Sequence, residues 1–317
     1  MGPLSLPHPS VPLCASPVPL RARRWPPDTF AVGVNLPWVT YGCDFGASAW
    51  FPHGGLAARP DALETYEGAL DRFARDQQSI VRLFLLCDCR SGVCFDEDGL
   101  PAGLDESFLR DADAALDRAA ERGLVIMPVL VDFHLCAAPC DVSGVRLGGH
   151  SRVLTDASAR DAFLSLVVRP IVERYADHPA VAAWDLFNEP EWCMREVSFE
   201  DLRDTLDALA GLVRSCAPQP VTVGSAGASS LDLVTGLGLD FYQVHWYTRF
   251  GWAALADPVA RFGLDRPVIL GEFPGRAVGT TPAEIVAAAR EAGYSAALIW
   301  SLLSDDRAAG YAAIALP

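Results

Sequence analysis

Eight short apolar runs, spaced between Phe30 and Leu302, are the feature that most restricts how this chain can fold. Each run is rich in Val, Ile and Leu, and longer stretches with helical periodicity lie between them. This alternation is typical of parallel strands that are buried on both faces by covering helices. The predicted strands are Phe30 to Leu36, Ser79 to Leu86, Leu124 to Val131, Val181 to Phe187, Val221 to Ser225, Phe241 to Trp246, Val268 to Glu272, and Ala296 to Leu302.

Helices are predicted between these runs where a capping residue precedes an amphipathic stretch. Gly123 and Gly293 each end such a stretch just before a strand, as expected for a helix C-terminal cap. Two further stretches, Ser229 to Leu237 and Gly251 to Phe262, have a weaker helical pattern. The helices predicted from the stronger patterns are Asp61 to Gln77, Asp105 to Arg122, Asp156 to Tyr175, Ser198 to Cys216, and Thr281 to Ala292.

Strand and helix alternation of this kind forms either a closed (β/α)8 barrel or an open doubly wound sheet. The open sheet that binds dinucleotides carries a glycine-rich phosphate turn after its first strand, and this sequence has none. We therefore predict a (β/α)8 TIM barrel over residues 28–317 as a single catalytic domain. Only residues 304–317 follow the last strand, so the eighth helix is predicted to be short or absent.

The first 27 residues have a different composition from the rest of the chain. Prolines, which remove backbone donors and favour extended chain, recur throughout this segment. We predict a proline-rich N-terminal arm over residues 1–27, with Trp25 covering part of the side that the missing eighth helix leaves open. The prolines interrupt the apolar stretch that a secretory signal needs, so a cytoplasmic location is the default expectation.

Charge and composition restrict the partners. The formal charge of −15 would repel polyphosphates and anionic membrane surfaces, so neither nucleic acid nor membrane is expected as a partner. All 25 basic residues are Arg, and the absence of Lys excludes Schiff-base and P-loop chemistry. A neutral small molecule or glycan suits these properties, and we expect a monomer without a cofactor.

Polar and aromatic residues follow the predicted strands at their C-terminal ends, where (β/α)8 barrels hold their active sites. Two of them are glutamates, Glu189 and Glu272. A single glutamate in such a place is as well explained by a structural ion pair, but two carboxyl groups about 5 to 5.5 Å apart are what retaining glycoside hydrolysis requires. The other candidates are Asn35, Trp38, Arg82, His134, Asn188, Trp192, His245, Trp246, Tyr247 and Trp300.

The ordered set of motifs resembles the clan A glycoside hydrolases, and within them family 5, which contains cellulases and β-mannanases. The resemblance extends from Phe30 to Trp300. The motifs are Val81-Arg82-Leu83, Val131-Asp132-Phe133-His134, Trp184-Asp185-Leu186-Phe187-Asn188-Glu189-Pro190, His245-Trp246-Tyr247, Leu270-Gly271-Glu272-Phe273 and Ile299-Trp300-Ser301.

The resemblance implies a role for most of the candidates. Glu189 would be the general acid/base and Glu272 the nucleophile, with Arg82 and Tyr247 holding Glu272 ionised. Asn188 would bond the 2-hydroxyl of the sugar. The remaining candidates would line the substrate site, with indole faces stacking on sugar rings: Asn35, Trp38, His134, Trp192, His245, Trp246 and Trp300.

The sequence indicates the substrate less directly than it indicates the catalytic residues. The stretch Arg174-Tyr175-Ala176-Asp177-His178-Pro179, which leads to Asn188-Glu189-Pro190-Glu191-Trp192, looks most like the β-mannanase branch, which favours β-1,4-mannan. A β-1,4- or β-1,3-glucanase with the same mechanism is the alternative. A non-catalytic sugar-binding barrel is a third hypothesis, although such proteins normally lack one of the two glutamates.

Cysteines and histidines raise the question of a metal. Five cysteines cluster in the loops after the second and third strands, where C-x-C and C-x3-C spacing could chelate zinc. Loop-stapling disulfides and free thiols are the competing interpretations, and Cys43 and Cys193 are possible partners. A metal-dependent hydrolase using His134 and His245 is also conceivable, but the first strand ends in Asn35 rather than in an H-x-H pair. We predict no metal. The five cysteines are Cys87, Cys89, Cys94, Cys136 and Cys140.

Overall fold

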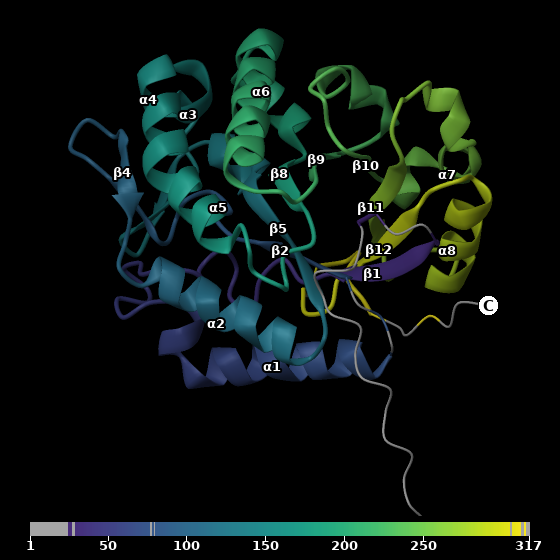
Figure 1. Cartoon of the computed structure of the whole chain (residues 1–317), viewed down its shortest axis with the longest axis horizontal. Coiled ribbons are helices and arrows are strands. Elements are labelled where there is room, and N and C mark those ends of the chain that lie inside the picture. The colour runs from purple at the N-terminus through teal and green to yellow at the C-terminus, as the bar shows by residue number, and fades with distance from the viewer. Residues whose placement is uncertain are drawn as a thin grey trace, which may run out of the picture.

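A computed structural model of the chain describes residues 25–26, 29–76, 78, 80–304, 306–311 and 314. Its centre is a closed barrel of eight parallel strands with helices around it (Figure 1), so the predicted fold class is confirmed. Each predicted run coincides with one strand to within a few residues. The strands, in chain order, are β1 (Ala31–Asn35), β2 (Ile80–Phe84), β5 (Val125–Asp132), β8 (Trp184–Asn188), β9 (Val221–Ser225), β10 (Tyr242–His245), β11 (Val268–Pro274) and β12 (Ala296–Trp300).

The predicted helices are present, with one difference. The stretch predicted as one helix from Asp156 to Tyr175 contains a π-helical turn, where Pro170 cannot donate a hydrogen bond to the preceding turn. Of the two weaker stretches, one forms only the 3-10 helix η6 (Ala228–Leu233), and the other forms α7 (Trp252–Ala256) and η8 (Val259–Phe262). The other α-helices and the π-helix η4 are α1 (Pro60–Arg75), α2 (Phe108–Glu121), α3 (Arg152–Thr155), α4 (Ala157–Ala162), η4 (Phe163–Val168), α5 (Arg169–Tyr175), α6 (Phe199–Cys216) and α8 (Pro282–Glu291). Short 3-10 helices also occur at η2 (Leu56–Ala58), η3 (Phe133–Cys136), η5 (Pro190–Arg195) and η7 (Thr248–Phe250).

Two short hairpins were not predicted. β3 (Val93–Phe95) pairs with β4 (Pro101–Leu104) in the loop after β2, and β6 (Cys140–Val142) pairs with β7 (Val145–Leu147) in the loop after β5. Strands of three or four residues are too short for period-2 alternation to be visible in the sequence. Both hairpins follow the C-terminal ends of barrel strands, on the side of the barrel where chemistry is expected.

Trp25 lies at the N-terminal end of the barrel, and its predicted position was wrong. It is 6% exposed and packs with the first inward-facing residues of the strands, such as Ile80, Val125 and Ala296. Its ring meets Phe241 edge-on at a centroid distance of 6.2 Å. Trp25 therefore closes the N-terminal end of the barrel and does not cover its side. Residues 1–24 and 27 of the predicted arm lie outside the described residues.

The segment after β12 takes the place of the eighth helix. Its described residues, 301–304, 306–311 and 314, contain no helix, as predicted. Tyr311 packs edge-on against Phe73 of α1 at 6.0 Å and donates a hydrogen bond to Asp76 at 2.6 Å. The amide of Gln78 donates to the carbonyl of Ile314 at 3.2 Å. The gap between α8 and α1 is therefore covered by extended chain. None of the described helices has the length and apolar character to cross a membrane.

We predict that Trp25→Ala lowers the free energy of unfolding by about 3 to 5 kcal/mol, the usual cost of truncating a buried aromatic side chain to alanine. Among the described residues the indole N–H of Trp25 has no hydrogen-bond partner, so the expected loss is one of packing. Urea unfolding of the variant and of Trp252→Ala, whose side chain is 44% exposed, measures the difference. Equal midpoints for the two variants would show that Trp25 does not close the barrel.

Candidate active site

A layer of buried polar side chains lies above the apolar bottom of the barrel, and Arg82 is its centre. Arg82 stands on β2 with no exposed surface. Its Nε donates to Asp185 at 2.8 Å and its Nη1 to Glu272 at 2.7 Å. Its remaining bonds go to Asn35 at 3.1 Å and Asn188 at 2.8 Å. One guanidinium thus joins side chains from strands β1, β8 and β11.

Glu272 is held from both sides. It stands on β11 and is 3% exposed. Arg82 donates to its Oε1, and the hydroxyl of Tyr247 donates to its Oε2 at 2.6 Å. Burial raises the pKa of Glu272, while His245, Arg82 and Tyr247 act in the opposite direction. Because Arg82 cannot lose its proton and touches the carboxylate directly, Glu272 is arranged as an anion with fixed orientation.

Glu189 has a different environment. It follows β8, where the chain turns into the 3-10 helix η5 (Pro190–Arg195), and its backbone is left-handed, with φ of 48°. Its Oε1 lies 2.8 Å from Nδ1 of His245, and its Oε2 accepts from the indole of Trp192 at 2.8 Å. Burial raises the pKa of Glu189 to about 7. Glu189 can therefore carry a proton near neutral pH, as a general acid must.

His245 is buried between the two glutamates. Burial lowers its pKa to about 4, so the ring is neutral near pH 7. Its Nδ1 faces Glu189, while its Nε2 has no partner. A side chain at position 224 would approach Nε2 to 3.1 Å and Arg82 Nη2 to 2.8 Å, so Gly224 leaves room for both groups. These neighbours favour the tautomer in which Nδ1 donates to Glu189.

The two carboxylates are close together. One oxygen of Glu189, one oxygen of Glu272 and one ring nitrogen of His245 all lie within 4.8 Å of one another. This separation fits direct attack by one carboxylate and is too short for the water that an inverting mechanism places between its two carboxyl groups.

The same three residues are the one group among the described residues whose atoms converge closely enough for a metal ion. Both oxygens of Glu272 already accept from Arg82 and Tyr247, and the guanidinium would repel a cation. The clustered cysteines do not form such a group in the described part of the chain. The described cysteines are free thiols, and Cys193 lies against Cys136 in the loops beside Glu189.

A chain of hydrogen bonds extends from Asn188 to the rim. The Nδ2 of Asn188 donates to Asp132 at 2.7 Å, and Asp132 also contacts Nδ1 of His134. Although burial opposes it, the carboxylate of Asp132 raises the pKa of His134. Nε2 of His134 lies 3.3 Å from the hydroxyl of Tyr41, which is 42% exposed. The amide of Asn188 keeps one N–H for a substrate hydroxyl.

Two predicted substrate contacts are absent. Asn35 has no exposed surface and donates to the carbonyl of Gly271 at 2.9 Å, so it positions Arg82 and cannot touch a sugar. Trp246 is 4% exposed, donates to the carbonyl of Gly251 at 3.0 Å and packs against Trp252. Successive side chains of a strand point to opposite faces, so His245 faces the barrel centre and Trp246 cannot.

Aromatic side chains lie at two places on the rim. Trp38 and Trp300 are half-buried, with ring centroids 6.3 Å apart, and the indole of Trp300 donates to Asp306 at 2.7 Å. Trp192 is 36% exposed beside Glu189. A cavity of about 570 Å³ adjoins Trp192 and is lined by Glu189 but not by Glu272.

Sequence reasoning missed several residues of the site. Asp185 was noted only as part of a motif, although a charge inside an apolar strand is a signal that it needs a buried partner. Arg249, whose guanidinium lies over the rings of Tyr247 and Trp192 at 5.4 and 5.8 Å, stands in a loop without any pattern. No sequence pattern indicates a role for Tyr41 either.

We predict that Trp192→Phe moves the alkaline limb of the pH profile of kcat/KM to higher pH by up to about one unit. The limb reports loss of the proton of Glu189, and the indole N–H stabilises the ionised form, so removing this donor raises the pKa of Glu189. Trp252→Phe, which changes an indole away from Glu189, should leave the limb in place. An unmoved limb in Trp192→Phe would mean that this contact does not control the acid.

Comparisons with known proteins agree with the fold. No protein-family model matches the chain. A mannan endo-1,4-beta-mannosidase of Mytilus edulis is 24% identical over 86% of this chain and 83% of its own length, and one of Cryptopygus antarcticus is 22% identical over 77% and 72%. The solved β-mannanase of Mytilus edulis superposes with a TM-score of 0.73 at 21% identity over 88% of each chain. The β-1,4-D-mannanase structure of Cryptopygus antarcticus has a TM-score of 0.73 at 20% identity over 89% of this chain and 86% of its own. The resemblance to the family 5 glycoside hydrolases is thereby confirmed, and the fold of this chain is that of the β-mannanases.

Proposed function

We propose that this protein is a retaining β-glycoside hydrolase that cleaves β-1,4-mannan internally. The observation that carries the proposal is the pair of buried glutamates, whose oxygens lie within 4.8 Å and whose surroundings favour opposite protonation states. Glu272 touches a guanidinium, whereas burial raises the pKa of Glu189 to about 7. A nucleophile and a general acid need this difference.

The reaction proceeds in two steps. Glu272 attacks the anomeric carbon while Glu189 gives its proton to the leaving glycosidic oxygen, which forms a glycosyl-enzyme ester and releases the first product. Glu189, now ionised, takes a proton from water while the water oxygen attacks the anomeric carbon. This attack breaks the ester bond and releases Glu272 as a carboxylate. Arg82 and Tyr247 hold the nucleophile, and His245 and Trp192 hold the acid.

Mannan is favoured over glucan by the relatives, which are named as endo-β-1,4-mannosidases and mannanases. A neutral glycan also suits the formal charge of −15, which repels anionic polymers.

We predict that the protein, assayed with a chelator present, shortens β-1,4-mannan chiefly to oligosaccharides and acts more slowly on β-glucans. Product length measured over time separates internal cleavage from release of single sugars. Glu272→Ala is the matched control and should be almost inactive. Faster cleavage of β-glucan would replace the substrate assignment by the glucanase alternative, and loss of activity in the chelator would point to a metal.

The roles of the two glutamates can be tested with azide. With an activated β-glycosyl substrate, azide should occupy the space left in Glu272→Ala and give the α-glycosyl azide. Glu189→Ala should still form the intermediate from a substrate with a good leaving group, and azide should then give the β-glycosyl azide. If the two variants gave the opposite anomers, the roles of Glu189 and Glu272 would be exchanged. A wild-type product of inverted anomeric configuration would exclude a nucleophilic role for either glutamate.

A further inference from the structure

A second cavity of about 570 Å³ lies outside the catalytic centre, on the same side of the barrel. Its walls come from the loops that follow β2 and β5, including residues of the β3–β4 and β6–β7 hairpins. Closure of the barrel needs neither hairpin, because all its strand pairs are formed without them. The two insertions instead enclose a space that nothing in the catalytic arrangement uses.

A buried carboxylate holds the two loops together. Asp88, which is 1% exposed, accepts from Arg90 at 2.6 and 2.9 Å and from the backbone N–H of Gly148 at 2.9 Å. Arg90 belongs to the first loop and Gly148 to the second. A buried ion pair with a further donor is costly to break, so the walls of the cavity keep their spacing.

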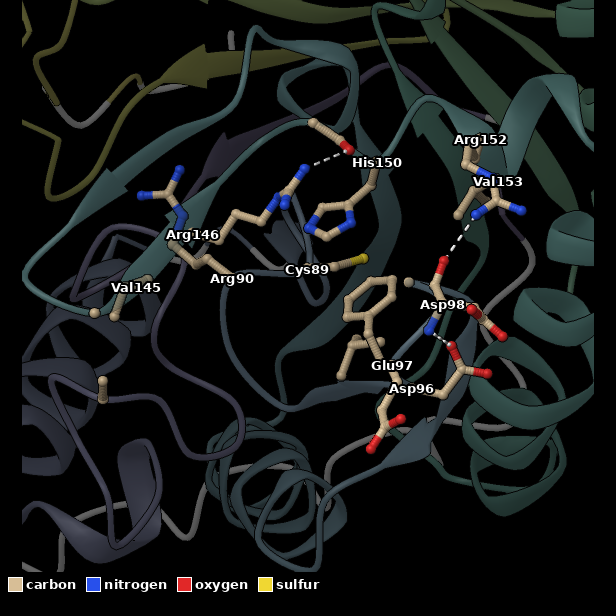
Figure 2. A pocket seen from close by; sticks show the side chains of 16 residues that line it. Cys89, Arg90, Asp96, Glu97, Asp98, Val145, Arg146, His150, Arg152 and Val153 are labelled. Carbon is tan, nitrogen blue, oxygen red and sulfur yellow. Dashed lines mark hydrogen bonds between the residues drawn. The ribbon is translucent and has the colours of Figure 1, made fainter.

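Charged groups of both signs line the cavity. Figure 2 shows Arg90 and Arg146 on one side, and Asp96, Glu97, Asp98 and Arg152 on the other. The guanidinium of Arg152 forms an ion pair with Asp156 at 3.2 Å. In the part of the chain that the structure describes, Arg146 forms no ion pair and donates only to the carbonyl of Gly149, at 3.3 Å. A neutral molecule with many hydroxyls can accept from Arg146 on one wall and donate to the carboxylates on the other.

An aromatic surface adds to this polar lining. The rings of Phe95 and His150 stack with centroids 4.2 Å apart and planes at 12°. Burial lowers the pKa of His150 to about 4, so this imidazole is neutral near pH 7. Flat rings beside hydrogen-bonding groups suit a pyranose, which has apolar C–H faces and a hydroxylated edge.

The cavity is close to the catalytic rim. The guanidinium of Arg90, which lines the cavity, lies over the ring of Tyr41 at 4.6 Å. The hydroxyl of Tyr41 lies 3.3 Å from Nε2 of His134. Two side chains thus connect the cavity with the active site, a separation that a glycan extending out of the cleft can bridge.

We propose that this cavity binds a neutral sugar unit of the β-glycan whose cleavage takes place at Glu189 and Glu272. The inference rests on the proposed function for the identity of the glycan. The sugar comes either from the main chain or from a branch, since both offer the same hydroxyls and C–H faces. Arg146 and Glu97 are the side chains through which the two walls would contact it.

The test compares Arg146→Gln and Glu97→Gln with the wild type on long and short substrates. Loss of one hydrogen bond to a neutral ligand should raise KM for soluble β-mannan by about three- to tenfold in each variant. The kcat/KM for an aryl β-mannobioside, which is too short to reach the cavity, should change less than twofold. Arg290→Gln, on the exposed face of α8, is the matched control and should change neither value.

Polymer binding is measured separately on a Glu272→Ala background by retardation in gels that contain β-mannan. If the cavity variants are retarded less by both linear and galactose-branched mannan, the sugar bound in the cavity belongs to the main chain. If they are retarded less by branched mannan alone, the bound sugar belongs to a branch. Unchanged KM and retardation would overturn the proposal, as would an equal loss on the short substrate. If the wild type cleaves no mannan, the proposed function fails, and retardation by a panel of neutral glycans still decides whether the cavity binds sugar.

Discussion

The buried guanidinium of Arg82 is the interaction on which the rest of the site depends. It joins Asp185, Glu272, Asn188 and Asn35 in the middle of the barrel, where an unpaired charge would cost several kcal/mol. Asp185 is also satisfied, because Gln243 donates to it at 2.6 Å. The strands of the barrel can close around these charges only because nearly every donor and acceptor of the layer has a partner. The same network fixes the nucleophile.

The difference between the two glutamates arises from what touches them rather than from burial alone. Both are less than a tenth exposed. Glu272 contacts a permanent positive charge and a phenol hydroxyl, whereas Glu189 contacts a neutral imidazole and an indole. A full charge stabilises an anion more than neutral donors do, so the contacts of Glu272 favour the ionised form more than those of Glu189 do, although one oxygen of each lies within 4.8 Å of the other. The neutral state of His245, which burial enforces, is part of this separation.

The rim is built from loops of unequal length, and those after β2 and β5 each carry a hairpin. Arg90 from the first of these loops and His134 from the second both contact Tyr41, which stands in the loop after β1, and the two loops form the second cavity. The catalytic layer consists of strand residues held by backbone pairing. The second cavity, by contrast, is lined by loops that carry hairpins, where changes in length do not disturb the barrel.

The sequence by itself determined the barrel, the eight strands and the two glutamates, because apolar periodicity and strand-end position are local properties of the chain. Only the tertiary structure decided that Asn35 supports Arg82, that Trp246 faces away from the cleft, and that Trp25 closes the bottom of the barrel. Burial and side-chain direction depend on neighbours far away in the chain, and a pattern read along the sequence does not contain them. For the same reason, the pairing of Asp88 with Arg90 and Gly148, and the cavity it supports, could be seen only in the folded chain.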